Sequence, residues 1–240
     1  MKLSHGLILL LAVTAAYAQT PVPAAAAAPP GFPFHDEALH YTISWPSGLS
    51  LGDANFSARH TAKGWEFEVA ADLAVPGFAI KDQFISDTNA QLCSSELRRD
   101  ASQGGKKTKE KTTFDLENHT GHRVTEYPSN GGSSDFNIGA CPRDAIAFVY
   151  FGRKELGQGR VPPAQDIYFG SAYSVHMEYT GAQNITLGDK KEVTDHLVVA
   201  VKGPKSDFAV EVFYARDAAR TPLVIKIPQA VGTLSMELVR

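Results

Sequence analysis

The feature that most constrains the fold is an alternation of apolar and polar residues that dominates the chain from Leu39 onward. In one clear run, Trp65, Phe67 and Val69 fall on one side and Glu66 falls on the other. A period of two is typical of half-buried β-strands. Roughly a dozen antiparallel strands exceed what a flat open sheet holds comfortably. We therefore predict an all-β, mainly antiparallel fold, either a strongly curved sheet or a barrel-like one.

One stretch departs from this alternation and has helical spacing. Ile146 and Tyr150 lie one helical turn apart. Pro142 suits a first helical turn, and Asp144 places a negative charge near the N-terminal end of the helix dipole. We expect a helix over residues 142–155 that closes or covers the curved sheet.

The beginning of the chain has the order of an export signal. A positive charge precedes the apolar segment Leu7 to Val13, and Ala16-Tyr17-Ala18 fits a cleavage site. The apolar segment is too short to span a bilayer. The stretch that follows is rich in Ala and Pro, as flexible tethers are. We predict a signal peptide over residues 1–18, a disordered tether over 19–34 and a single β domain over 35–240. The mature protein is expected in the periplasm, with secretion as the alternative.

The two cysteines, Cys93 and Cys141, would both enter a compartment in which thiols are usually oxidised. A disulfide between them would close a loop of roughly 50 residues and stabilise the fold by about 4 kcal/mol in the chain-entropy treatment. Two free buried thiols or a redox pair are the alternatives, although redox pairs usually have C-x-x-C spacing. We predict the disulfide.

Composition narrows the range of partners. The formal net charge is −3 and both signs are mixed along the chain, which gives no general reason to expect a nucleic acid partner. No segment after the signal approaches the ~20 apolar residues of a membrane helix, so we expect a protein that does not span the membrane. No cofactor is predicted.

Two motifs could in principle carry chemistry. Gly48-Leu49-Ser50-Leu51-Gly52 matches the G-x-S-x-G of serine hydrolases, but that chemistry needs a strand-to-helix turn and this motif joins two predicted strands. His119 and His122, close to Asp115 and Glu117, could supply metal ligands, but they flank a predicted turn where surface histidines are common. We predict no catalytic residue, no metal site and no enzymatic activity.

A basic group flanks one predicted hairpin. Its members are Arg98, Arg99, Lys106, Lys107 and Lys109. Such a group could contact an anion, for example a lipid phosphate or a polysaccharide. Alternating charges also protect an exposed edge strand from aggregation, and this second interpretation is favoured.

Aromatic residues form another group of interest. They are Trp45, Phe56, Trp65, Phe67, Phe84, Phe148 and Tyr150. Inside a curved sheet these side chains could line a pocket for an apolar ligand. Ordinary core packing explains them equally well, so both interpretations stay open.

Several short motifs occur in a recognisable order. They are Leu39-His40-Tyr41-Thr42-Ile43-Ser44-Trp45 with Gly52-Asp53-Ala54, then Cys141-Pro142-Arg143-Asp144, then Phe213-Tyr214-Ala215-Arg216-Asp217 with Arg220-Thr221-Pro222 and Gly232. From residue 39 to 239 the chain resembles the exported bacterial family called domain of unknown function 3108 (DUF3108). The resemblance implies a mainly antiparallel β fold in the bacterial envelope. It implies no agreed activity and no catalytic residues. Pro46, directly after the first tryptophan, departs from the family pattern and leaves the register of the opening hairpin open.

The leading functional hypothesis is a non-enzymatic envelope protein that binds a lipid or another apolar or amphipathic molecule in its curved sheet. The alternative is a structural or interaction module that binds an envelope protein or glycan, and a hydrolase ranks third. The packing of the protein interior would distinguish the first two hypotheses. A large apolar void favours the carrier, whereas a packed core favours the interaction module.

Overall fold

The computed structural model describes residues 35–75, 77–204, 207–229 and 232–240. The predicted signal peptide (1–18) and tether (19–34) lie outside the described residues. The first eight strands are β1 (Glu37–Ser44), β2 (Ser50–Thr61), β3 (Gly64–Val75), β4 (Phe78–Asn89), β5 (Ser94–Gln103), β6 (Lys106–Asp115), β7 (Thr120–Tyr127) and β8 (Ser133–Asn137). The later elements are β9 (Arg143–Asp144), α1 (Ala145–Gly157), β10 (Gln165–Tyr168), β11 (Ala172–Leu187), β12 (Lys190–Lys202), β13 (Asp207–Ala215), β14 (Pro222–Gln229) and β15 (Gly232–Leu238).

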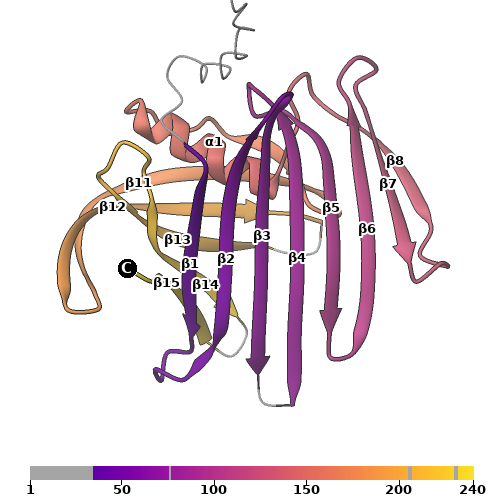
Figure 1. The fold of residues 1–240 in the computed structure, drawn as a ribbon. Helices are drawn as coiled ribbons and strands as arrows, with labels where there is room; N and C mark the ends of the chain where they lie inside the picture. Colours follow the sequence, from indigo (N-terminus) through magenta and orange to yellow (C-terminus); the bar gives the residue numbers. More distant parts are fainter. Residues whose placement is uncertain (1–34, 76, 205–206, 230–231) are drawn as a thin grey trace, which may run out of the picture.

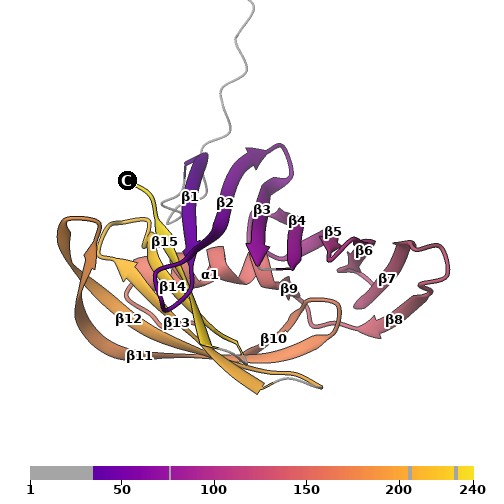
Figure 2. The same ribbon diagram turned by 90° about the horizontal axis from the view of Figure 1, so that it is seen from below.

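In this described part of the chain, fifteen strands form one sheet in the order β8-β7-β6-β5-β4-β3-β2-β1-β15-β14-β13-β12-β11-β10-β9. All pairs are antiparallel except β9 with β10. The pairing of β1 with β15 joins the two ends of the chain. The sheet bends strongly, so that β1–β8 form one wall and β10–β13 curve back to form the other (Figure 1, Figure 2). The predicted fold class is confirmed, and the sheet is curved without closing, since β8 and β9 are free edges.

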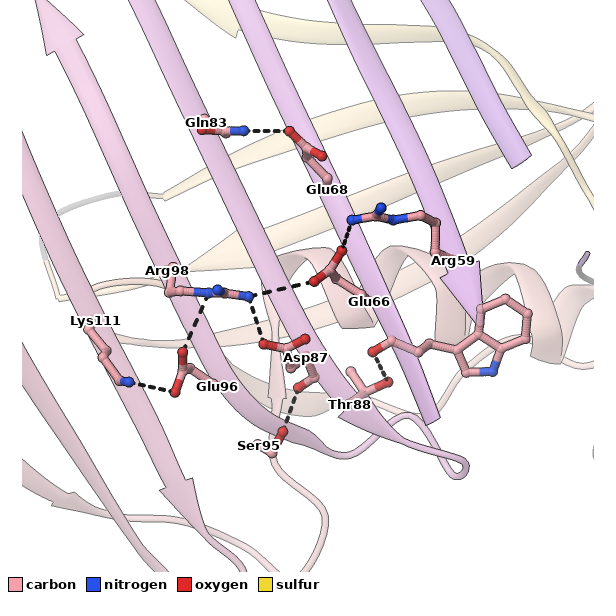
Figure 3. A network of polar contacts seen from close by, with 11 residues as sticks. Arg59, Glu66, Glu68, Gln83, Asp87, Thr88, Ser95, Glu96, Arg98 and Lys111 are labelled. Carbon is pink, nitrogen blue, oxygen red and sulfur yellow. Dashed lines mark hydrogen bonds and ion pairs between the residues drawn. The ribbon is translucent and has the colours of Figure 1, made fainter. Parts of the chain in front are cut away.

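The alternation seen in the sequence places the apolar side of each strand on the concave face. Trp65 and Phe67 of β3 are buried there, while Glu66 and Glu68 lie on the convex face in contact with other polar side chains (Figure 3). Because one face must be apolar and the other solvated, the register of β3 cannot slip by one residue without exposing its core.

The helix α1 lies inside the bend, against the concave face (Figure 2). It begins at Ala145, so the predicted start at Pro142 is wrong by three residues. The reason is the N-cap: the carboxylate of Asp144 accepts hydrogen bonds from the backbone N–H groups of Ile146 (2.8 Å) and Ala147 (3.0 Å). Asp144 and the residue before it are extended and pair with β10 as strand β9.

A polar junction fixes the start of α1 to the sheet. The buried hydroxyls of Ser86 on β4 and Ser94 on β5 donate to the Asp144 carboxylate at 2.6 and 2.7 Å. The predicted disulfide between Cys93 and Cys141 is present directly beside these contacts. Covalent and hydrogen-bonded links therefore hold the helix N-terminus at one position on the sheet.

The helix packs on the sheet through aromatic contacts. The ring of Tyr150 stacks on that of Phe67 with centroids 3.9 Å apart, and Phe67 in turn lies parallel to Trp65. The other helix face buries Phe148 and Leu156 against β11–β13. Figure 1 shows α1 crossing only the upper part of the concave face. Within the described residues, no helix is long and apolar enough to cross a membrane.

Candidate functional site

The part of the concave face that α1 leaves uncovered borders a cavity of about 420 Å³ that opens to solvent. Its walls come from α1, from β1–β4 on one side and from β10–β15 on the other. All of the lining side chains are hydrocarbon or thioether except that of Tyr214. Burial raises the pKa of the Tyr214 hydroxyl to about 12, so this single polar group stays protonated and uncharged near neutral pH. The cavity is therefore an apolar space without any charge.

The seven aromatic residues singled out in the sequence divide into two groups. Phe56, Phe84 and Phe148 line the cavity. Trp65, Phe67 and Tyr150 instead pack together in a closed cluster between α1 and β3. The seventh, Trp45, packs against a separate cluster at the β1–β15 seam.

Most of the lining consists of smaller residues, which the aromatic pattern of the sequence does not indicate. They include Ala54 and Ala71 on neighbouring strands, and the valines at 199, 201, 210 and 212 on β12 and β13. The feature of the sequence that could have identified them is the alternation of apolar and polar residues, which places these valines on one face of the sheet. Small side chains on that face leave space unfilled where the opposite wall does not reach across.

At the end beside α1, a buried ion pair lies just outside the cavity lining. Arg153 of α1 is 1% exposed and holds Glu37 of β1 with both terminal nitrogens, one of them at 3.0 Å. Its Nε donates to the carbonyl oxygen of Ala219 at 3.0 Å. Tyr41 donates its hydroxyl to the carbonyl oxygen of Pro222, a residue of the lining, at 2.8 Å. These partners satisfy the charge of Arg153 outside the cavity lining.

The other end of the cavity extends toward the hairpin turns. Lining residues against the helix, such as Met177 and Tyr214, are buried, whereas Ile227 and Leu234 next to the β14–β15 turn are only partly buried. The β3–β4 turn lies at the far end of the sheet from α1 (Figure 1). We therefore take the end beside the hairpin turns, called the turn end below, as the entrance.

The basic group lies mainly on β5 and β6 and is largely neutralised. On the convex face, Arg98 contacts Asp87 at 2.8 Å and also reaches Glu66 and Glu96 (Figure 3). Lys109 pairs with Asp100 at 2.9 Å.

Arg99 lies between Asp82 and Glu110, at 3.6 Å from each. Lys106 and Lys107 differ from the other three. Both are exposed beside the β5–β6 turn and form no ion pair with any described residue.

Each of the two chemical motifs spans a turn and the start of the strand that follows it. The serine-hydrolase-like segment 48–52 covers the end of the β1–β2 turn and the first residues of β2, so a strand follows the turn in place of a helix. His119 lies in the β6–β7 turn with φ of 53°, while His122 pairs with Asp135 on the surface. Over the described residues, no three His, Cys, Asp or Glu side chains gather in a way that could hold a metal ion.

Gly52, the last residue of the serine-hydrolase-like segment, has a structural role that can be tested. Its φ is 141°, and an added Cβ would lie 2.0 Å from the backbone oxygen of Asp72 on β3. We expect Gly52→Ala to lower the free energy of unfolding by about 2 kcal/mol or more, because both the backbone angle and the strand spacing must change. Gly139→Ala, with no atom near its Cβ, is the control for urea denaturation. Equal stability of the two variants would contradict this role.

Comparison with known proteins agrees with this geometry. The chain matches the family described as "Protein of unknown function (DUF3108)" over residues 40–239. Among solved structures it is similar to a β-barrel-like protein of domain of unknown function DUF1849 from Brucella abortus, with a TM-score of 0.63 and 10% sequence identity. That match covers 85% of this chain and 96% of the other. At this identity the likeness concerns the fold alone. A search among curated proteins finds no significant sequence match.

Proposed function

This chain belongs to the DUF3108 family of proteins of unknown function, and on that premise we propose that it is a non-enzymatic carrier for an apolar or amphipathic molecule. The observation that carries the proposal is the apolar cavity of about 420 Å³. Ligand pockets typically measure about 300–1,000 Å³, and an apolar cavity of about 150 Å³ already binds benzene. A fully packed interior would have favoured the alternative role as an interaction module.

The apolar lining of an open cavity also supports a bound ligand. Because the cavity opens to solvent, its hydrocarbon walls are in contact with water when no ligand is bound. Removal of apolar surface from water is favourable, so a hydrocarbon ligand in the cavity would be stabilised by covering these walls.

The lining also limits the ligand chemistry. A charged or strongly polar group inside the cavity would find only the Tyr214 hydroxyl as a partner and would lose its hydration. The enclosed part of the ligand is therefore hydrocarbon. Any polar head group lies at the turn end, where the cavity meets solvent.

A periplasmic location is part of the proposal. It is supported by the export signal in the sequence and by the disulfide between Cys93 and Cys141. Disulfides persist in oxidising compartments and are rare in the cytosol.

The absence of enzymatic activity is likewise a proposal, and it is supported by the chemistry of the cavity. The arrangement most similar to a catalytic one involves His196, which lies between Thr180 and Glu211 on the sheet. Its Nε2 is 3.1 Å from Glu211, but Gln183 also occupies its Nδ1 at 2.9 Å. None of these residues lines the cavity. Activity against ester substrates that is lost on His196→Ala would overturn this part of the proposal.

A filling substitution tests the carrier role. Ala71 lines the cavity, whereas its neighbour Ala70 lies on the opposite face of β3. We expect Ala71→Phe to weaken binding of parinaric acid, a fluorescent fatty acid, by about tenfold or more, equivalent to about 1.4 kcal/mol. Native mass spectrometry of the purified full chain should show the same loss of co-purified lipid.

Ala70→Phe is the matched control and should bind as the wild type does. If the wild-type protein neither binds parinaric acid nor carries lipid, or if the two variants bind equally well, the cavity is not a ligand site.

A further inference from the structure

We propose that the turn end of the sheet docks on an anionic lipid bilayer, with the cavity entrance facing the membrane. This inference rests on the proposed carrier role and names the surface from which the ligand would be loaded. Its observations are independent of the ligand. They are the exposed apolar side chains and the unpaired lysines at one end of the molecule.

The apolar part of this surface continues the cavity lining outward. Phe208 of β13 lies on the same strand face as Val210 and Val212, which line the cavity, and is 38% exposed. On the opposite wall, Phe78 of β4 lies on the same strand face as the lining residue Phe84 and is 45% exposed. Two aromatic side chains therefore extend the hydrocarbon surface of the cavity beyond its entrance, one from each wall.

A third exposed apolar side chain lies along the same edge of the sheet. Leu49, in the β1–β2 turn, is 54% exposed. In a meander the β1–β2, β3–β4 and β5–β6 turns fall at one edge, as Figure 1 shows at the foot of the sheet. Exposed Leu and Phe side chains, clustered beside cations, are typical of surfaces that bury into the lipid headgroup region.

The charge at this end complements an anionic surface. On β4–β7 every lysine and arginine pairs with a carboxylate except Lys106 and Lys107. Both flank the β5–β6 turn, where Gly104 lies against the Phe78 ring. The two uncompensated cations of β4–β7 thus belong to the turn that contacts the exposed ring of Phe78. Lysines near a bilayer surface are attracted by acidic lipids, and the attraction falls with rising salt.

Docking in this orientation would let a hydrocarbon chain pass between bilayer and cavity without crossing water. Exposure of apolar surface to water is the main barrier to moving such a chain. The apolar entrance and the cationic β5–β6 turn would therefore both contribute to the transfer of a hydrocarbon chain between the bilayer and the cavity. On the convex face, Arg98 is neutralised by carboxylates from neighbouring strands (Figure 3).

Vesicle flotation with the full chain tests the proposal. We expect binding to vesicles of phosphatidylglycerol mixed with phosphatidylcholine, and much weaker binding to phosphatidylcholine alone. The triple variant Phe78→Ser, Lys106→Glu, Lys107→Glu should bind the anionic vesicles at least about tenfold more weakly. The matched control is Val193→Ser, Lys190→Glu, Lys191→Glu, which removes one exposed apolar side chain and two exposed lysines near the β11–β12 turn. It should bind as the wild type does.

Parinaric acid binding without vesicles separates this proposal from the carrier role. A turn-end variant that still binds parinaric acid but not vesicles supports docking and shows that the variant is folded. Equal vesicle binding by the turn-end and control variants would overturn docking. Failure of the wild type to bind anionic vesicles while it binds parinaric acid would also overturn docking. It would leave the carrier role intact.

Discussion

Asp144→Ala is expected to lower the free energy of unfolding by about 3–5 kcal/mol. The substitution removes the N-cap of α1, which typically contributes about 0.5–2 kcal/mol. It also leaves the buried hydroxyls of Ser86 and Ser94 without their acceptor, at about 1–3 kcal/mol each. Urea denaturation followed by circular dichroism measures the loss.

Two further variants show whether the effect comes from the buried acceptor. Asp144→Asn keeps one acceptor oxygen and should lose less stability than Asp144→Ala. Asp166→Ala removes an exposed carboxylate on β10 and should stay within about 0.5 kcal/mol of the wild type. A similar small loss for Asp144→Ala and Asp166→Ala would contradict the role of Asp144 in fixing the helix.

The buried carboxyl of Asp144 should also make the free energy of unfolding depend on pH. Burial raises the pKa of Asp144, and hydrogen bonds from Ser86, Ser94 and the helix N-terminus oppose the shift without cancelling it. Folding therefore favours the protonated form. The stabilisation is fully present below the unfolded pKa of about 3.9 and is lost as the pH rises through the folded value. Asp144→Asn should accordingly lose more stability relative to the wild type at about pH 4 than at about pH 8.

Removal of the disulfide is the second large effect. The double variant Cys93→Ala, Cys141→Ala opens a loop with a sequence separation of 48. In the chain-entropy treatment this lowers the free energy of unfolding by about 4 kcal/mol, because the unfolded chain gains freedom. Thermal unfolding with and without a reducing agent measures the difference.

The reduced wild type should match the double variant, and the reducing agent should leave the double variant unchanged. We expect the variant to keep its fold at room temperature, because the backbone N–H of Ser94 still donates to the Pro142 carbonyl at 2.8 Å. Unchanged thermal stability of the wild type after complete reduction would show that the Asp144 contacts alone hold this junction.

Asp144→Ala and the loss of the disulfide both act on the contacts that fix the N-terminus of α1 to the sheet, and these contacts set the position of α1 within the bend. A helix displaced along the concave face would change how much of that face is covered, and with it the volume of the cavity. We therefore expect Asp144→Ala to weaken parinaric acid binding as well as stability. The Ala71→Phe variant should affect binding alone.

Several features of the molecule were predictable from the sequence because they are local. The alternation around Trp65 and Phe67 determines which side chains share a face of a strand. The start of α1 was predicted less well, since Pro142 and Asp144 both fit a first helical turn. Hydrogen bonds from the helix N–H groups show that Asp144 is the cap, and the contacts with Ser86 and Ser94 fix that cap to the sheet.

The ion pairs of the basic residues could not be predicted from the sequence, because their carboxylate partners lie on other strands. Arg98 and Arg99 have the same charge pattern in the sequence as Lys106 and Lys107, yet only the first two face carboxylates from other strands. Which cations remain uncompensated is decided by the register between strands. That register cannot be inferred from one strand alone.

Sequence by itself determined the β class, the disulfide partners and the face on which each side chain lies, because these follow from residue type and from a period of two along the chain. Only the tertiary structure decided which of those side chains line a void. Phe67 and Phe84 have the same signature in the sequence, but Phe67 meets Tyr150 of the helix and Phe84 borders the cavity. The difference comes from the bend of the sheet and the position of α1. Both are set by contacts between segments far apart in the chain, and no local pattern encodes them.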